Sequence, residues 1–441
     1  MKRPNFPQDF IIGSATASYQ VEGDREGRTS CIWDDFSRIP GKVWCGENGD
    51  VAADQVNRMK EDVALMAKLG LQAYRFSVSW TRVMPHGGDK VNETGIEYYR
   101  SLCNELHKYG IKACCTIYHW DLPSELEANG GWANRETAYI YQRYAEMLFT
   151  KLGDVVDMWI TFNEPFCICF LGYGVGVHAP GKSDEKAFAS AVHYTNLAHG
   201  LAVESYRKTG LKAPIGIVWN PIVPRSATSK KEDKEAALRA RAIQSEIYMG
   251  PVVGKRYPKV VTEDMGFSFP ILEGDMETIS SKIDFYGINY YNEHPVEKDT
   301  GKLGFREAES WEEVTTGMKW PVVEEGLVRL LQWTDEYTNH LDVYITENGS
   351  AEEDVVSSDG RIHDKKRIDY YAKHLNAAEK IIRKGVPLKG YFCWSFIDNY
   401  EWTFGYTKRF GLIYCDYQNL SRIPKDSAYY IRDVIAGYGD F

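Results

Sequence analysis

Residues 56–80 read VNRMKEDVALMAKLGLQAYRFSVSW and contain two periodicities, one directly after the other. In the first part, apolar residues recur every three or four positions, which is the spacing of one face of an α-helix. Gly70 ends this pattern, as glycine commonly does just past the last helical turn. Residues 73–80 follow with aromatic and β-branched side chains, which are typical of a strand. The stretch therefore predicts a helix followed closely by a strand.

The same alternation of helices and strands recurs from end to end of the chain. We expect strands at residues 10–17, 73–80, 112–120, 155–162, 214–219, 283–290, 341–346 and 388–396. We expect helices at about 56–69, 94–109, 136–152, 185–209, 231–248, 325–338, 368–382 and 427–436. Each predicted strand is thus followed by a helix, and parallel strands need such crossovers.

Eight strand–helix units in 441 residues predict an α/β fold, a single (β/α)8 TIM barrel with long βα loops. An open doubly wound sheet is the alternative, but no glycine-rich turn follows the first strand, as nucleotide-binding folds require. No Pro-, Gly- or Ser-rich linker divides the chain, so we expect one domain over residues 1–441. Long connections follow two strands, at 20–49 and 293–321, and such loops build the active site of a barrel.

The composition argues against several classes of protein. The chain has 52 Lys and Arg against 62 Asp and Glu, and its formal net charge of −10 does not favour nucleic-acid binding. The N-terminal residues lack the apolar run of a secretory signal, and no stretch reaches the ~20 apolar residues of a membrane span. We therefore expect a cytoplasmic protein that binds neither nucleic acid nor membrane.

The nine cysteines show no zinc-site spacing, and no cofactor motif is present. Cys114 and Cys115 are adjacent, and Cys167 and Cys169 form a C-x-C pair. Both pairs lie in apolar runs, which favours plain core packing over metal binding. The sequence thus predicts an enzyme without cofactor or metal, in a reducing compartment.

Two predicted strands end in a glutamate with a helix breaker close behind. Residues 159–165 read WITFNEP and residues 344–349 read YITENG, which places Glu164 after the fourth strand and Glu347 after the seventh. Strands three apart in a barrel of eight lie nearly across its mouth, so the two carboxylates can approach. Two carboxylates that flank a cleft are what cleavage of a glycosidic bond needs. Either glutamate alone has a helix cap or an ion pair as its alternative role.

Two further strands carry polar side chains where an apolar side chain would be expected. Arg75 lies in an apolar strand, and a buried guanidinium is costly unless a carboxylate pairs with it. We expect Arg75 inside the barrel, where it keeps ionised the carboxylate that acts as nucleophile in the cleavage. A structural ion pair is the alternative. His119 and Trp120 end the third strand, where a neutral imidazole can hydrogen-bond sugar hydroxyls, with core packing as the alternative.

The eighth strand and its loop read WSFIDNYEW over residues 394–402. Trp394 and Trp402 flank the carboxylates of Asp398 and Glu401. Hydroxyl groups can donate to such a carboxylate while the apolar face of a sugar ring stacks on indole. The segment predicts a binding site for a neutral polyol, with core packing as the alternative for the two tryptophans.

Taken together, these segments resemble the β-glucosidases and β-galactosidases of glycoside hydrolase family 1. The resemblance extends nearly end to end, from residues 10–22 to 411–416. It is carried by FIIGSATASYQVEG at 10–23, YRFS at 74–77, TFNEP at 161–165, ITENG at 345–349 and the 394–402 segment. Each segment alone is a weak to moderate signal, whereas the combination is highly specific.

The resemblance implies a retaining mechanism in which Glu164 is the acid/base and Glu347 the nucleophile. It also implies that Tyr291 touches the nucleophile, with Asn289 nearby and Arg75 beneath it. Residues implied to contact the substrate are Gln20, His119, Trp120, Asn163, Trp320, Trp394, Glu401, Trp402 and Phe410. Among these, Trp394 would lie beneath the sugar ring and Trp320 would form the wall of the leaving-group subsite.

The implied reaction releases terminal non-reducing β-D-glucosyl residues from β-glucosides and cellobiose-like oligosaccharides, as in cellulose breakdown. β-Galactosidase, β-fucosidase and transglycosidase activities remain as alternatives on the same site. Phospho-sugar members carry serine where Glu401 stands and tyrosine where Phe410 stands. Lys408 alone matches them, and a carboxylate at 401 would repel a 6-phosphate. Thioglucosidases carry glutamine where Glu164 stands, so O-glycosides are expected.

Two other classes of barrel protein are less favoured. Relatives that bind glycans or proteins without catalysis usually lose one of the two carboxylates, and this chain keeps both. Aldolase- or isomerase-type barrels commonly bind phosphate after strands seven and eight, where this chain has Glu-Asn-Gly and an aromatic–acidic loop. The expected partners are therefore small-molecule β-glycosides, with a homo-oligomer left open.

Overall fold

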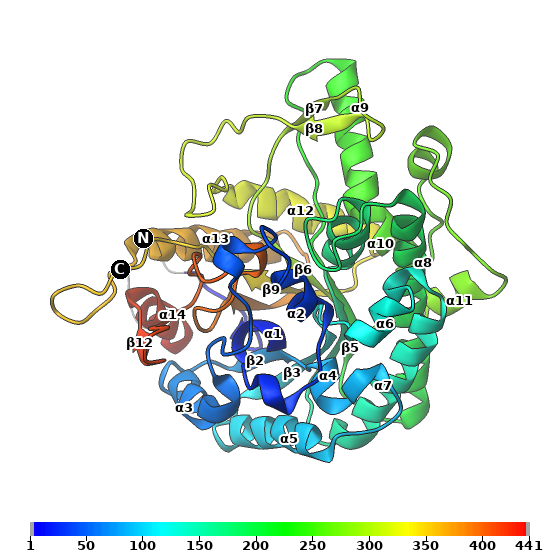
Figure 1. Cartoon of the computed structure of the whole chain (residues 1–441). Helices are drawn as coiled ribbons and strands as arrows, with labels where there is room; N and C mark the ends of the chain where they lie inside the picture. The colour runs from blue at the N-terminus through cyan, green and yellow to red at the C-terminus, as the bar shows by residue number, and fades with distance from the viewer. Residues whose placement is uncertain (1–3, 438–441) are drawn as a thin grey trace.

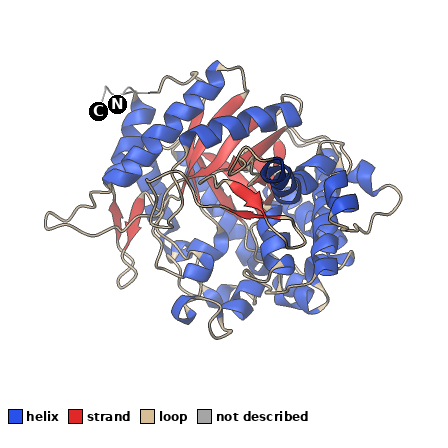
Figure 2. Ribbon diagram, turned by 90° about the horizontal axis from the view of Figure 1, so that it is seen from above, coloured by secondary structure: helices blue, strands red, loops and turns tan. Residues whose placement is uncertain are grey.

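Eight runs of β-branched and aromatic residues form one closed, parallel barrel in the computed structural model, which describes residues 4–437 (Figures 1 and 2). The barrel strands are β1 Ile11–Ala15, β2 Ala73–Ser77, β3 Lys112–Tyr118, β4 Met158–Asn163, β5 Ile215–Trp219, β6 Phe285–Asn289, β9 Asp342–Asn348 and β10 Leu388–Trp394. They pair in chain order, and β1 closes the barrel by pairing with β10. The predicted (β/α)8 TIM barrel is confirmed.

Helices surround the barrel on the outside, as the view from above shows (Figure 2). The long ones are α3 Gln55–Lys68, α5 Glu93–Lys108, α7 Glu136–Leu152, α8 Glu185–Thr209, α9 Lys231–Arg241, α12 Glu324–Tyr337, α13 Lys365–Arg383 and α14 Asp426–Ala436. Shorter helices are α1 Ser18–Val21, α2 Ile32–Ser37, α4 Trp80–Val83, α6 Ser124–Ala128, α10 Ile247–Val252 and α11 Asp275–Ile279. Outside the barrel there are also two two-stranded sheets, β7 Val296–Lys298 with β8 Phe305–Glu307, and β11 Ile413–Cys415 with β12 Arg422–Pro424.

The predicted boundaries differ from the observed ones mainly at strand ends. The strands predicted at 10–17 and 73–80 end earlier, at Ala15 and Ser77, because the short helices α1 and α4 begin three residues later. The helix predicted at 231–248 is interrupted after α9 by the π-helical turn Ala242–Glu246. In that turn the Ser245 hydroxyl exchanges two hydrogen bonds with the backbone of Ile222, in the loop after β5. The wider turn therefore ties this helix to the rim of the barrel.

Side chains alternate along the barrel strands between two buried clusters. In β3, Cys115 and Ile117 pack in the large cluster that contains the surrounding helices, whereas Cys114 belongs to a smaller cluster with residues such as Phe285 and Phe392. This alternation follows from the two-residue period of a strand. The adjacent pair Cys114–Cys115 is thus core packing, as predicted. All nine cysteines are free thiols, and only Cys45 is exposed.

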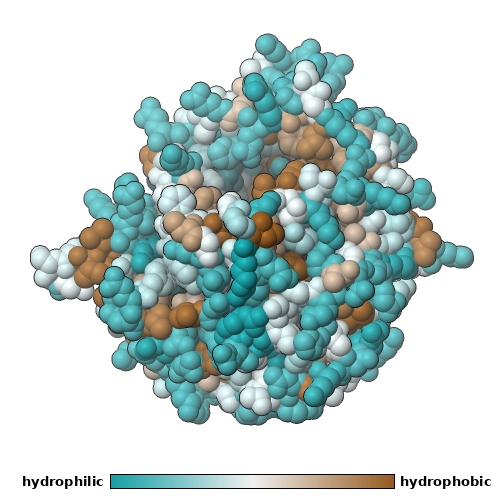
Figure 3. Space-filling model, in the orientation of Figure 1, coloured by the Kyte–Doolittle hydropathy of each residue, from teal (hydrophilic) through white to brown (hydrophobic). Residues whose placement is uncertain are grey.

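The face of the molecule seen in Figure 1 is mostly hydrophilic, with small separate hydrophobic patches (Figure 3). Among residues 4–437, no helix combines the length and the apolar character needed to cross a membrane. The hairpin β7–β8 stands beside α9 at the top of Figure 1, within the long connection between β6 and α12. The chain therefore extends this βα loop well beyond the barrel rim.

Candidate active site

A cavity of about 280 Å³ lies at the carboxyl ends of the barrel strands. Most of the predicted site residues line it: His119, Trp120, Asn163, Glu164, Tyr291, Trp320, Glu347, Trp394, Glu401, Trp402 and Phe410. Three predicted residues, Gln20, Arg75 and Asn289, are buried and are not part of this lining. The structure thus gathers residues from seven separate parts of the sequence, as expected for the C-terminal face of a barrel.

Glu347, near the end of β9, is held by groups from two other strand regions. The Arg75 guanidinium, on β2, donates to its Oε1 at 2.6 Å, and neither side chain is more than 4% exposed. The Tyr291 hydroxyl, just after β6, donates to its Oε2 at 2.7 Å. Both contacts favour the ionised carboxylate. The ion pair that the apolar strand around Arg75 required is therefore the one to Glu347.

Glu164 follows β4 with a positive φ of 50°, an uncommon conformation for a residue with a side chain. The Asn289 amide donates to its Oε1 at 2.6 Å, and the Cys167 thiol donates to its Oε2 at 3.0 Å. No cation bonds it directly among the described residues. Such strained backbone commonly marks functional positions.

The two carboxyl groups differ in their ionisation because their neighbours differ. Burial raises the pKa of Glu164 and the charge of Glu347 raises it further, to about 7. Burial also raises the pKa of Glu347, but Arg75 and Tyr291 stabilise its ionised form and limit the rise. Glu347 is therefore the stronger acid of the pair, and Glu164 keeps its proton up to a pH nearer to neutrality.

Asn163 joins these residues from the middle of the site. Its Oδ1 accepts from the Arg75 guanidinium at 2.6 Å and from Asn289 at 3.0 Å. Its amide nitrogen lies 3.2 Å from Nε2 of His119, and its carbonyl accepts from the Trp120 indole at 2.9 Å. Because the amide nitrogen can only donate, His119 must accept at Nε2 and carry its proton on Nδ1.

Several buried polar atoms around the cavity have no hydrogen-bond partner within residues 4–437. They include Oε1 of Gln20, Nδ1 of His119 and Oε2 of Glu401. Burial lowers the pKa of His119 well below its usual value, so the imidazole is neutral and its Nδ1–H is a hydrogen-bond donor. Burial raises the pKa of Glu401 to about 8. Since buried polar groups are normally paired, these atoms mark places for a polar ligand.

Aromatic rings form the walls of the cavity. Tyr291, Trp320 and Phe410 lie with ring centroids 5.6–6.2 Å apart on one side. The rings of Trp120 and Trp402 have centroids 4.5 Å apart, and both residues have a positive φ. Apolar faces next to unpartnered polar atoms suit a ligand with hydroxyl groups and an apolar C–H face.

The sequence profile of glycosyl hydrolase family 1 matches residues 2–439. The chain belongs to this family. Beta-glucosidase A of Thermotoga maritima is 44% identical over 446 aligned positions, which cover 100% of this chain and 99% of the relative. The 1,4-beta-D-glucan glucohydrolase of Thermotoga neapolitana is 43% identical over 441 positions, which cover 98% and 99%. The solved structure of the family 1 β-glucosidase from T. maritima superposes with a TM-score of 0.96 at 43% identity, covering 100% of both chains.

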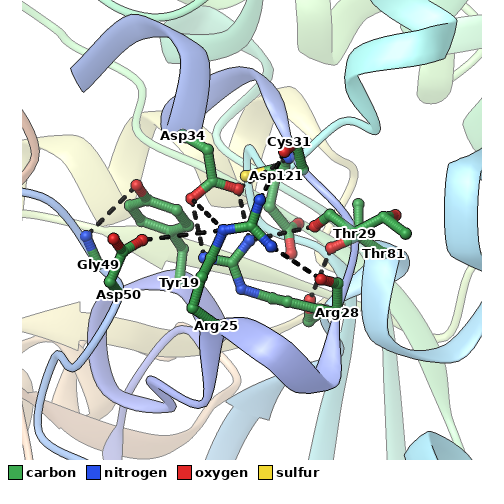
Figure 4. A network of polar contacts seen from close by, with 12 residues as sticks. Tyr19, Arg25, Arg28, Thr29, Cys31, Asp34, Gly49, Asp50, Thr81 and Asp121 are labelled. Carbon is green, nitrogen blue, oxygen red and sulfur yellow. Dashed lines mark hydrogen bonds and ion pairs between the residues drawn. The ribbon is translucent and has the colours of Figure 1, made fainter. Parts of the chain in front are cut away.

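This family 1 glycoside hydrolase holds its long first loop with a buried ion pair (Figure 4). Arg28 donates to both carboxylate oxygens of Asp34 at 2.5 and 2.9 Å, and the backbone N–H of Cys31 donates to the same carboxylate. Trp33, next to Asp34, contacts Trp402 with ring centroids 4.6 Å apart. The bidentate pair therefore fixes the loop against one wall of the cavity.

Several residues that line the cavity are not among those predicted from the sequence. The unpredicted residues that line the cavity are Phe166, Cys167, Leu171, His178, Asn220, Asn292, Met318, Thr403 and Phe404. Asn220 directly follows β5, so the strand-end criterion used for Glu164 applies to it equally. His178 lies in a loop without such a mark. Cys167 is buried as predicted, but it also contacts Glu164, which core packing alone does not describe.

Lys408, which matches the phospho-sugar members of the family, is engaged elsewhere. Its ammonium group donates to the carbonyl of Gly317 at 2.7 Å. Gly317 precedes Met318 and Trp320, which line the cavity. The lysine therefore connects the loop after β10 to the loop that carries Trp320.

Proposed function

We propose that this hydrolase is a retaining β-glucosidase, in which Glu347 is the nucleophile and Glu164 the acid/base. The observation that carries the proposal is the difference between two carboxyl groups in one cavity. Glu347 is bonded to the Arg75 guanidinium and to Tyr291, whereas burial and the neighbouring charge raise the pKa of Glu164 to about 7. One group is thus prepared to attack and the other to deliver a proton.

In the first step, Glu347 attacks the anomeric carbon while Glu164 protonates the departing glycosidic oxygen. This forms a covalent glycosyl-enzyme and releases the aglycone. The mechanism needs the two carboxyl groups about 5–5.5 Å apart, on opposite faces of the reacting bond. Tyr291, which donates to Oε2 of Glu347, steadies the carboxylate as it forms the bond.

In the second step, Glu164 removes a proton from water, which attacks the same carbon and releases the sugar. Esterified Glu347 no longer carries charge, so one of the causes that raise the pKa of Glu164 is gone. Glu164 is then the stronger acid, and its ionised form acts as the base. The same residue serves as acid and then as base because its neighbour changes charge.

The sugar site combines unpartnered polar atoms with aromatic faces. We assign glucose hydroxyl contacts to Gln20, His119 and Glu401, whose free atoms supply two acceptors and one donor. Trp394, whose ring lies parallel to the His119 ring at 6.0 Å, would lie beneath the sugar. Hydroxyl donors favour the ionised form of Glu401, because they replace the water that burial removes. Glu401 can accept from the 4-hydroxyl of glucose or of galactose.

The names of the compared relatives support glucose as the released sugar. These relatives are named β-glucosidase and 1,4-β-D-glucan glucohydrolase, and each aligns with this chain over nearly the full length of both proteins. Release of glucose from cellobiose, in the cytoplasm, completes the proposal. The nine unpaired cysteines agree with such a reducing compartment.

Two experiments test the proposal. Proton NMR of the first-formed sugar from a β-glucoside should show the β-anomer, because two inversions retain the configuration, and an initial α-anomer rules out the scheme. A panel of aryl β-glycosides with gluco, galacto, fuco, manno and 6-phospho-gluco donors, beside cellobiose and lactose, should give the highest kcat/KM with the glucoside. A higher value with galactoside or fucoside would reassign the donor, and glycoside products in excess of free sugar would indicate a transglycosidase.

A further inference from the structure

Cys167 occupies an unusual place for a buried thiol. It begins the π-helix Cys167–Gly174, three residues after Glu164, and its backbone N–H donates to the Glu164 carbonyl at 2.9 Å. This turn brings its side chain back onto the carboxyl group, with the sulfur 3.0 Å from Oε2 of Glu164. On its other side the sulfur accepts from the Asn220 amide at 3.4 Å. Asn220, Cys167 and Glu164 therefore form a chain of hydrogen bonds along the cavity wall.

The two oxygens of Glu164 have different partners. Oε1 lies 2.6 Å from the amide nitrogen of Asn289, a group that can only donate, so Oε1 must act as an acceptor. A carbonyl oxygen is a better acceptor than a carboxyl O–H, so the Asn289 contact favours the acid proton of neutral Glu164 on Oε2, the oxygen that the Cys167 thiol contacts. When Glu164 loses this proton, the thiol supplies a donor to the same oxygen.

We propose that Cys167 is a positioning residue for Glu164: its thiol donates to Oε2 of the ionised carboxylate and holds that oxygen at the cavity. This inference rests on the acid/base role assigned to Glu164 in the proposed function. A thiol is a weak donor, so it steadies the ionised group without keeping the oxygen from taking up a proton again. Each catalytic cycle requires both states of this oxygen.

Other charged and titratable groups also act on Glu164, and the test must separate them from Cys167. Glu347 from β9 and Arg75 from β2 act on it through their charges. Tyr291, after β6, and Glu401, after β10, also interact with its charge. All four remain in place when only Cys167 is changed, so the effect of the thiol can be measured alone.

The contact predicts the effect of substitutions at position 167. Cys167→Ala removes a donor to the ionised form, so the pKa of Glu164 should rise by about 0.5–1 unit. Cys167→Ser keeps a donor at the same place, so the pKa should stay at or below the wild-type value. Cys169→Ala is the matched control. It removes a buried thiol from the same π-helix, and that sulfur contacts Thr195 at 3.5 Å rather than Glu164.

The experiment measures the basic limb of the pH profile of kcat/KM with an aryl β-glucoside for all three variants. The pKa of Glu164 is also followed directly, by carbon-13 NMR of enzyme labelled at the glutamate carboxyl carbons, with the signal identified through Glu164→Gln. Thermal melting confirms that each variant is folded. The expected result is a rise in Cys167→Ala, its reversal in Cys167→Ser and no change in Cys169→Ala.

An unchanged pKa in Cys167→Ala, or the same rise in Cys167→Ser, overturns the inference. If the wild-type enzyme cleaves no glycoside, the proposed function fails, and the NMR titration still decides whether the thiol stabilises the carboxylate. If the wild-type enzyme is active and the Glu164 signal does not move, only the role of Cys167 fails.

Discussion

Replacing Glu347 by glutamine should lower the pKa of Glu164, because it removes a negative charge that opposes loss of the Glu164 proton. At the 5–5.5 Å that retention requires, two unit charges interact by about 3 kcal/mol at an effective dielectric constant of ~20, or about 2 pKa units. Burial is the larger cause of the raised value, and it persists in the variant. We therefore expect the pKa of Glu164 to fall from about 7 by one to two units and to stay above 4.5.

The assay is a carbon-13 NMR titration of glutamate carboxyl carbons in wild-type enzyme and in Glu347→Gln. Glu401 also titrates late, since burial raises its pKa to about 8, so its signal is identified separately through Glu401→Gln. Wild-type enzyme in which a 2-deoxy-2-fluoroglucosyl group esterifies Glu347 provides a second measurement. Glu347 is uncharged in this glycosyl-enzyme as well, so we expect the same fall in the pKa of Glu164.

An unchanged or higher pKa of Glu164 in both samples would refute the reasoning. It would mean that burial alone sets the ionisation of Glu164 and that the switch from acid to base does not follow from the charge of its neighbour. If the pKa of Glu164 falls in Glu347→Gln but not in the glycosyl-enzyme, the bound sugar rather than the charge of Glu347 determines this pKa during the reaction.

Further substitutions test the remaining roles. Glu347→Ala should lower kcat by about 10⁴-fold or more, and azide should restore turnover with an α-glycosyl azide as product, detected by NMR; full activity without azide removes the nucleophile role. Glu164→Ala should slow glycosylation of substrates with poor leaving groups by about 10²–10⁴-fold and spare activated aryl glucosides, as pre-steady-state kinetics would show; equal slowing of both contradicts the acid role. Glu401→Ala should lower kcat/KM by about 10²–10³-fold, and a glucoside that lacks the 4-hydroxyl should lose little more in that variant. Asp275→Asn should lower the free energy of unfolding by about 2 kcal/mol at pH 7, because contacts from Arg135 and His193 outweigh burial and lower the pKa of Asp275 to about 2. That stabilisation is present above pH 3.8 and is lost as the pH falls toward 2, so calorimetric melting temperatures of the two proteins should converge in acid.

The barrel could be predicted because its elements repeat a pattern that is local in sequence. Periods of 3.6 and 2 residues distinguish helices from strands, and the helices at 136–152 and 185–209 were found with their observed ends. The hairpin β7–β8 and the short helices α1, α2 and α4 have no such period, since they are only three to six residues long. Their conformation depends on contacts such as the Arg28–Asp34 pair, which no local pattern reveals.

The gathering of the predicted site residues follows from topology, since parallel strands bring their carboxyl ends to one rim. This explains why Glu164 and Glu347 reach one cavity although 183 positions separate them. Cys167 was missed because the residues around it are apolar and indicate a core. The three-residue spacing from Glu164 is the signal that could have found it, because positions three apart on a helical turn lie side by side.

Glu164 and Glu347 are chemically identical side chains, and their ionisation differs because of the strand on which Arg75 lies. Arg75 points from β2 into the barrel and donates to Glu347 on β9 and to Asn163 on β4, but not to Glu164 itself. Burial alone would raise the pKa of both carboxyl groups and leave them to compete for one proton. The direct ion pair breaks this symmetry in favour of ionised Glu347. Asn163, which accepts from Arg75 and from Asn289, links the arginine to the amide that holds Glu164. The asymmetry that the proposed retaining mechanism needs is therefore a property of the barrel interior, present before any substrate enters.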